Sequence, residues 1–199
     1  DLPLPRLHGD HQISNAATAI SAVKTFAEQN AIPINSFAFE KGISTAFWPG
    51  RMQQICRGDL IASLPDNSEI WLDGGHNPDA AKMAASFMAD LEERDSKPLI
   101  LVCGMLTTKD VDGYFREFAS LVHRVITVPI QSSDAGYDPN TLAIFSKDCG
   151  LSSSSSPSLQ EALASIHETA DNPKGFRVLI GGSLYLVGDA LELNGIHPK

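Results

Sequence analysis

The sequence predicts an α/β protein, with an open and mostly parallel sheet that carries helices on both faces. Apolar runs of strand length alternate about five times with segments that carry helix signals. These runs are continuous rather than alternating, which is typical of strands that helices cover on both sides. In such sheets ligands bind at the carboxyl ends of the strands, so the loops that follow those ends are the candidate sites.

The predicted strands are the apolar runs at residues 69–72, 98–103, 124–128 and 176–180. Helices are expected to follow them. Asn77 before Pro78 is a typical helix start, and Ser158 with Glu161 has the spacing of a capping box. The predicted helices are 77–93, 110–121, 138–147, one that begins at 158, and 183–193. The serine run 152–156 is interpreted as a flexible surface connection without a function.

The first section, residues 1–47, differs from the rest. Residues 11–29 predict a helix whose apolar positions, at spacings of three and four, form one stripe. These positions are Ile13, Ala16, Ala17, Ile20, Val23 and Phe26. One helix with its flanks cannot close a core, so we expect this section to pack against something outside the chain. The predicted division is therefore 1–47, an incomplete preceding domain, and 48–199, the α/β domain.

Composition excludes several classes of protein. The chain has 199 residues, of which 43% are hydrophobic and 20% charged, which argues against disorder. Its net charge of −9 disfavours general binding to nucleic acid or to anionic membranes. No apolar stretch approaches the roughly 20 residues that span a bilayer, and no secretory signal is present. The cysteines, Cys56, Cys103 and Cys149, are odd in number and contain no Cys-x-x-Cys, so a reducing, cytoplasmic location is expected.

Loop one, residues 73–78, combines a carboxylate at a strand end with two glycines, an imidazole and a helix start. The free N–H groups of that helix start favour an anion. Asp73 can accept from a pair of ribose hydroxyls, and His76 can donate to a phosphate. The alternative is a tight turn in which Asp73 bonds its own loop and His76 is a surface residue. The Gly-x-Gly-x-x-Gly fingerprint of dinucleotide-binding proteins is absent.

Further candidates stand elsewhere, each with a structural alternative. In loop two, residues 104–110, Lys109 can hold a carboxylate or a phosphate, or it is a solvated lysine before a helix cap. Ser183 follows two glycines in loop four, residues 181–183, and can also be only a helix cap. Arg51 presents a guanidinium from a turn that can be a plain connector. Asn15 can read an adenine edge, or it is a structural residue of its helix.

The order of these motifs resembles one family, folylpolyglutamate synthase/dihydrofolate synthase of the Mur ligase superfamily, in its carboxyl-terminal part. The resemblance covers nearly the whole chain. In chain order the motifs are His11-Gln12-x-x-Asn15-Ala16-Ala17, Pro49-Gly50-Arg51, Asp73-Gly-x-His76-Asn77-Pro78, Lys109-Asp110 and Gly182-Ser183-Leu184-Tyr185-Leu186. The usual form of loop one has Ala at the position of Gly75. The stretch from Arg51 to Asp73 is longer than usual, which predicts that Arg51 is displaced from Asp73.

The resemblance implies an enzyme that uses ATP and Mg²⁺ to add L-glutamate to dihydropteroate or folate through an acyl phosphate. The Rossmann-like domain would close over the nucleotide and help to bind glutamate. By position in the motifs, Asn15 would contact adenine, Arg51 the phosphates and Asp73 the ribose, with His76 beside the nucleotide. Lys109 and Ser183 stand where the superfamily holds the carboxylate of the amino acid. Amine attack on an acyl phosphate needs positioning and charge neutralisation more than a new nucleophile.

The phosphate loop Gly-x-x-x-x-Gly-Lys-Ser/Thr does not occur in the sequence. The resemblance therefore implies that catalytic residues and magnesium ligands lie outside this chain, and that residues 1–47 are the tail of a central ATPase domain. The chain alone is expected to be inactive and monomeric.

Three alternatives stay open. The first is a self-contained adenine-nucleotide-binding regulatory module. The second is a nicotinamide-dependent oxidoreductase, which the missing glycine fingerprint disfavours. The third is a sibling Mur ligase that acts on a cell-wall precursor, although the order of the motifs favours the folate branch.

Overall fold

The computed structural model describes residues 2–9, 11–168 and 172–195. They form two compact units, Asp1–Pro49 and Gly50–Lys199, and each is described by itself. The division falls two residues after the boundary that the sequence suggested.

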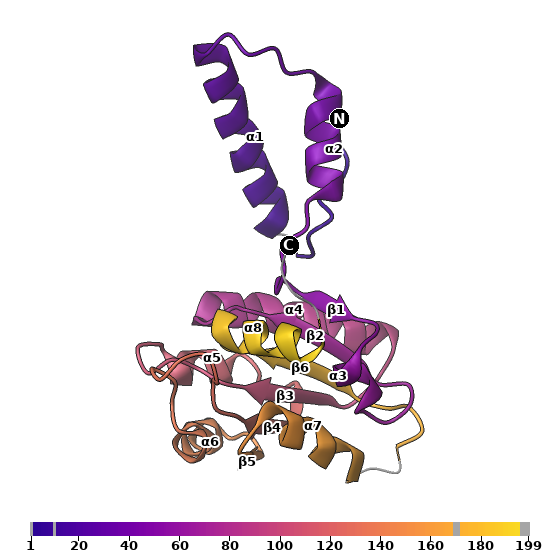
Figure 1. Cartoon of the computed structure of the whole chain (residues 1–199), viewed down its shortest axis with the longest axis vertical. Coiled ribbons are helices and arrows are strands. Elements are labelled where there is room, and N and C mark those ends of the chain that lie inside the picture. The colour runs from indigo at the N-terminus through magenta and orange to yellow at the C-terminus, as the bar shows by residue number, and fades with distance from the viewer. Residues whose placement is uncertain (1, 10, 169–171, 196–199) are drawn as a thin grey trace. The chain divides into compact units, whose positions relative to one another are not determined.

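The smaller unit contains two helices, α1 (His11–Gln29) and α2 (Ser36–Thr45) (Figure 1). The helix predicted at 11–29 is confirmed. Within the described part of this unit only Gln12 and Ala27 are buried. The apolar stripe of α1 is instead exposed, with Ile13 at 50% and Phe26 at 59%. The unit therefore has no core of its own, because a pair of helices can bury only a small part of its apolar surface.

The larger unit is built on a six-stranded sheet in the order β1-β2-β6-β3-β4-β5. Strand β1 is antiparallel to β2, and every other neighbouring pair is parallel. The strands are β1 (Gln53–Ile55), β2 (Glu69–Asp73), β3 (Leu99–Cys103), β4 (Val122–Thr127), β5 (Ser153–Ser155) and β6 (Arg177–Gly181). This arrangement confirms the predicted fold class.

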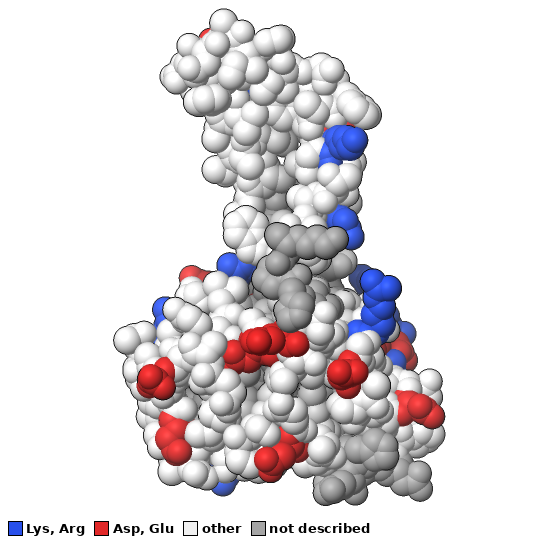
Figure 2. Space-filling view, viewed as in Figure 1, with Lys and Arg blue, Asp and Glu red and all other residues white. Residues whose placement is uncertain are grey.

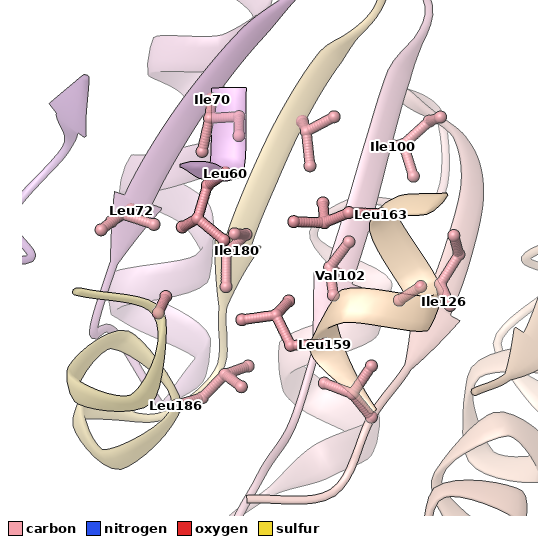
Figure 3. Packing of buried hydrophobic residues seen from close by; sticks show 14 of the residues in the cluster. Leu60, Ile70, Leu72, Ile100, Val102, Ile126, Leu159, Leu163, Ile180 and Leu186 are labelled. Atoms are coloured by element: carbon pink, nitrogen blue, oxygen red, sulfur yellow. The ribbon is translucent and has the colours of Figure 1, made fainter. Parts of the chain in front are cut away.

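Helices cover both faces of the sheet (Figure 1). One face packs against α4 (Pro78–Arg94), α5 (Val111–Arg116) and α6 (Pro139–Asp148). The other packs against α3 (Asp59–Ala62), α7 (Leu159–Glu168) and α8 (Leu184–Leu193). Figure 3 shows Leu159 and Leu163 of α7 lying over Val102 and Ile126 of the neighbouring strands. Apolar residues on both faces of each strand explain why the runs do not alternate.

Predicted helix caps are confirmed at several starts. The side chain of Asn77 accepts from the Ala80 N–H, and that of Asp138 accepts from the Thr141 N–H. Ser158 Oγ accepts from the Glu161 N–H at 3.1 Å, which is one of the two bonds of the predicted capping box, and it also donates to Glu161 Oε1 at 3.4 Å. These interactions are local in the chain, which is why sequence spacing could predict them.

The serine run was wrongly interpreted as a flexible connection. Residues 153–155 form β5, which pairs in parallel with β4. The Val125 N–H donates to Ser152 O and the Ser156 N–H donates to Thr127 O, both at 2.8 Å. An edge strand of this kind is held by its backbone ladder, so its side chains need not be apolar.

Other boundaries differ from the prediction. Helix α5 ends at Arg116 rather than at Leu121, because tighter turns continue the chain, with Phe118 N–H donating to Phe115 O at 3.0 Å. Strand β1 and helix α3 were not predicted. Both are very short, which leaves no period for a sequence pattern to show.

At the carboxyl edge of the sheet, the strand order contains a switch point around β6. Strand β6 lies between β2 and β3, although it comes last in the chain. The loops after β2 and β3 lead to α4 and α5 on one face, whereas the loop after β6 leads to α8 on the other. Asp73, Gly181 and Cys103 are register partners at the ends of these strands. Ligands of open α/β sheets bind at such a switch point.

Candidate functional site

Asp73 shapes loop one at the end of β2. Its Oδ1 accepts from the Gly75 N–H at 2.8 Å, and its Oδ2 accepts from the Met52 N–H at 3.0 Å. The carboxylate therefore bonds its own loop, as the structural alternative anticipated. Each carboxylate oxygen has a second lone pair, so these bonds do not prevent Asp73 from accepting from a hydroxyl. Asp73 is 9% exposed, which leaves it at the margin of the site.

Arg51 lies beside loop one, and the expected displacement is wrong. The Gly74 N–H donates to Gly50 O at 2.8 Å, and the Met52 N–H donates to Asp73 Oδ2. These two hydrogen bonds hold the turn that contains Arg51 against loop one. Helix α3 and its flanking turns follow β1 and precede β2. They leave the start of β1 in register with the end of β2, since Gln53 pairs with Leu72.

The Arg51 guanidinium is half-buried and makes no hydrogen bond or ion pair with any described residue. Met52, the next residue, is buried with a φ of 42°. A residue other than glycine in this left-handed region is strained, and here the bond to Asp73 and burial of the side chain hold it. The turn is thus rigidly held, and the Arg51 guanidinium that it carries has no partner among the described residues.

His76 is oriented by its own loop. Its Nδ1 lies 3.1 Å from Gly74 O. A carbonyl only accepts, so Nδ1 carries the hydrogen and Nε2 is an acceptor in the neutral ring. His76 can therefore donate to a phosphate through Nε2 only as an imidazolium.

Loop four touches loop one. A side chain at Gly74 would collide with the Leu184 side chain, which shows how closely the start of α8 approaches the end of β2. Ser183 is 2% exposed, and its Oγ accepts from the Tyr185 N–H at 3.1 Å. It caps α8, as its structural alternative anticipated. Its hydroxyl hydrogen is still available to an acceptor.

Lys109 follows β3 in loop two, and its backbone N–H donates to Leu106 O at 3.1 Å. The side chain is half-buried, and its ammonium makes no ion pair within the described part of the chain. Asp110, next to it, caps α5 by accepting from the Gly113 N–H. A side chain at Gly113 would meet Pro78 Cγ at 2.6 Å, so the starts of α5 and α4 are neighbours.

Asn15 belongs to the smaller unit and is described there by itself. It is exposed on α1, and its Nδ2 donates to Gln12 Oε1 at 3.1 Å. The remaining candidates, Arg51, Asp73, His76, Lys109 and Ser183, follow or flank the carboxyl ends of β2, β6 and β3.

Two buried groups below this edge are not reactive. Burial raises the pKa of the Cys103 thiol and that of the Tyr114 phenol. Cys103 is fully buried and Tyr114 is 2% exposed, so both are packing residues. No group of three or more His, Cys, Asp or Glu side chains that could hold a metal occurs among the residues with a described position.

Sequence reasoning missed residues that support the site. Gln53 Oε1 accepts from the Gly50 N–H at 2.9 Å, and Asp189 of α8 accepts from backbone groups of the loop after β4. Neither residue belongs to a motif, because their partners are set by how the chain folds.

No described helix is long and apolar enough to cross a membrane. On the face that Figure 2 shows, acidic side chains lie dispersed over the larger unit.

A mostly parallel sheet with capped helix starts, and with a guanidinium and an ammonium that have no partner among the described residues at its switch point, defines a Rossmann-like α/β domain. The chain belongs to the family of the dihydrofolate synthetase C-terminal domain, whose family model matches residues 59–193. This confirms the resemblance to folylpolyglutamate synthase/dihydrofolate synthase that the order of the motifs indicated.

Individual relatives agree with this assignment. The folylpolyglutamate synthase of Lacticaseibacillus casei is 29% identical over 187 residues, which cover 94% of this chain and 39% of that protein. A Mycobacterium tuberculosis folylpolyglutamate synthase solved with ADP and AMPPCP has a TM-score of 0.79 and 25% identity, covering 100% of this chain and 42% of that one. The Yersinia pestis bifunctional enzyme solved with AMPPNP and a Mn ion has a TM-score of 0.72 and 25% identity, with 96% and 40% covered. The chain thus spans about two fifths of each.

Proposed function

We propose that this chain is the nucleotide-closing and glutamate-binding part of an ATP-dependent ligase that adds L-glutamate to dihydropteroate or folate. The observation that carries the proposal is the meeting of Arg51, Asp73 and His76 at the switch point of the sheet, in a chain of this family. The relatives' names specify folate ligases, and two of them were solved with adenine nucleotides.

The nucleotide would lie over loop one. Arg51 would neutralise phosphate oxygens, because its guanidinium has no other described partner and presents a fork of donors. Asp73 would accept from the ribose hydroxyls, and His76 would lie beside the nucleotide. Asn15 of the smaller unit would contact the adenine.

The incoming glutamate would lie nearer β3 and β6. Lys109 would hold its carboxylate as a point charge, and the Ser183 hydroxyl would donate to the same group. The reaction joins the glutamate amine to an acyl phosphate with release of phosphate. This step gains most from holding the amine close to the carbonyl carbon, so the chain needs to supply position and positive charge rather than a nucleophile.

The apolar face of α1 fits a place against a central ATPase domain. Ile13, Val23 and Phe26 are 44–59% exposed, so burying the rest would contribute about half of the roughly 1.5–3 kcal/mol that full burial of an apolar side chain provides. Residues 1–47 would be the tail of that domain, and Mg²⁺ with the phosphate loop would belong to it. We propose that the enzyme containing this chain is monomeric and cytoplasmic.

An Arg51→Ala variant tests the nucleotide site. In the whole polypeptide that carries this chain, we expect the KM for ATP in glutamate-dependent ADP formation to rise about tenfold or more, because a charged hydrogen-bonding partner is lost. Folding should be unaffected, since the guanidinium makes no bond to a described residue. Arg57→Ala is the matched control, because Arg57 is exposed and follows β1 at the opposite end of that strand. Equal KM values for the two variants would contradict the proposal.

Experiments on the 199-residue chain alone test which functions belong to it and which to the central ATPase domain. We expect it to form no folate–glutamate bond and to bind ATP weakly, because most phosphate contacts would lie in the central domain. Isothermal titration with ATP and a ligation assay measure both properties. Tight nucleotide binding without ligation would favour the regulatory module, and turnover by the pure chain would refute the proposed division.

A further inference from the structure

We infer that Asp189 is a positioning residue that holds Lys109 in place through two loops; this inference rests on the proposed glutamate role of Lys109. Asp189 lies within α8 and is 8% exposed, a rare state for an aspartate. Its Oδ2 accepts from the Gln131 N–H at 2.8 Å and from the Ser132 N–H at 3.4 Å. The carboxylate thereby fastens loop three, residues 129–137, to the helix.

Those two bonds are the main attachment of the middle of loop three. Near its start the loop is anchored by Ile130, which is 6% exposed in the core, and at its end by Tyr137, whose ring lies 5.6 Å from that of Phe145. Between these apolar anchors, residues 131–134 are bonded to another described element only through Asp189. Hydrogen bonds to a carboxylate are stronger than those to neutral groups, so one side chain suffices for this attachment.

Loop three in turn holds loop two. Thr107 N–H donates to Ala135 O at 2.9 Å, and Tyr137 N–H donates to Met105 O at 2.8 Å. Leu106 and Gly136 form an antiparallel bridge between these bonds. Lys109 follows two residues after Thr107, and its own N–H returns to Leu106 O. Loop two is thus paired with loop three just before the lysine.

Helix α8 then organises both proposed glutamate contacts. Ser183 caps its first turn, and Asp189 connects it through loops three and two to Lys109. The two contacts approach the site from strands β6 and β3, which are neighbours in the sheet. A common anchor on α8 keeps their separation constant, and the geometry of a bound carboxylate depends on that separation.

Amide hydrogen exchange on the 199-residue chain tests whether Asp189 holds loops three and two in place. In Asp189→Ala we expect exchange at Gln131, Thr107 and Tyr137 to accelerate about tenfold or more, from the loss of charge-assisted bonds. Strand β6 should exchange as before, because alanine suits a helix and the freed N–H groups belong to exposed loop residues. Asp189→Asn should show a smaller acceleration, since its amide oxygen still accepts. Glu192→Ala, an exposed change in the same helix, is the matched control.

Unchanged exchange at Thr107 and Tyr137 would overturn the inference. An equal acceleration everywhere, β6 included, would also overturn it, because it would show a general loss of stability. Acceleration confined to loops two and three supports it.

Steady-state kinetics on the whole polypeptide that carries this chain then separate the inference from the proposed function. We expect Asp189→Ala to raise the KM for glutamate about tenfold with less than about a twofold change in the KM for ATP, and Asp189→Asn to lie between it and the unaltered protein. If Lys109→Ala leaves the KM for glutamate unchanged, the proposed glutamate site is wrong. Amide hydrogen exchange would then still show whether Asp189 holds loops three and two. If Lys109→Ala raises it and Asp189→Ala does not, the inference is wrong and the proposed site stands.

Discussion

Among the described residues Arg177 is the largest side chain that is fully buried, and it lies at the start of β6, at the edge of the sheet opposite to the candidate site. Its guanidinium contacts Glu69 at 3.3 Å and Glu92 at 3.4 Å, and donates to Asp95 O at 2.9 Å. Lys97 contacts the other oxygen of Glu69 at 2.7 Å. A buried cation needs such partners, because removing one leaves an uncompensated charge. This network therefore joins the starts of β2 and β6 to the end of α4.

The same network predicts how stability depends on pH. Burial raises the pKa of Glu69, but hydrogen bonds from Lys97, Trp71 and Arg177 outweigh burial and lower the pKa below 4.5. A carboxyl whose pKa is lowered on folding stabilises the fold above its unfolded pKa, and this contribution is lost as the pH falls through the folded pKa. Glu69 should thus contribute fully at pH 7 and progressively less below about pH 4.5.

Glu69→Gln should be less stable than the unaltered chain by about 2 kcal/mol at pH 7, with the difference shrinking as the pH falls below 4.5. Urea unfolding at pH 7, 5, 4 and 3 measures this difference. Glu93→Gln is the control, because Glu93 is exposed and makes no ion pair within the described ranges. A pH-independent difference for Glu69→Gln would show that its charge is not what stabilises the network.

Among the elements, β5 shows how far a local pattern can mislead. A run of serines resembles a linker, yet it completes the sheet because the edge of β4 offers a row of backbone groups. Ser155 Oγ adds a bond to Asn140 Oδ1 at 2.7 Å, which ties the strand to α6. The identity of these side chains matters less than the backbone donors that face β4.

Ser156→Pro should destabilise the chain by about 1–3 kcal/mol, because proline removes the N–H that donates to Thr127 O at 2.8 Å. Ser156→Ala keeps that backbone bond and loses only the side-chain bond to Ser158 O, so it should cost much less. Thermal or urea unfolding of the two variants measures the difference. If both are equally stable, β5 does not contribute to stability as a strand.

At the scale of the whole molecule, the two units differ in how they are stabilised. Every buried hydrophobic residue that the structure describes, except Ala27, lies in the larger unit. Its two clusters cover both faces of the sheet, whereas the smaller unit leaves the apolar face of α1 exposed. The larger unit therefore has what independent folding requires.

A chain of residues 48–199 should keep a cooperative unfolding transition, with a free energy of unfolding within about 1 kcal/mol of that of the 199-residue chain. The core that folding creates is the same in both. Circular dichroism in increasing urea measures both transitions. A non-cooperative transition, or strong binding of a hydrophobic dye by the shorter chain, would show that residues 1–47 are needed for folding.

The amino-acid sequence alone was enough for the features that depend on neighbours in the chain. Helix starts such as Asn77-Pro78 and Ser158, the apolar strands and the class of fold follow from local capping and periodicity. The order of the motifs was enough for the family.

Other features required the folded chain. The insertion of β6 between β2 and β3, the pairing of β5 and the register that keeps Arg51 beside Asp73 arise from hydrogen bonds between strands far apart in sequence. Burial of Arg177 and the attachment of Asp189 to loop three join residues separated by tens of positions. No local pattern encodes such pairs, because each partner is chosen by the packing of the whole sheet.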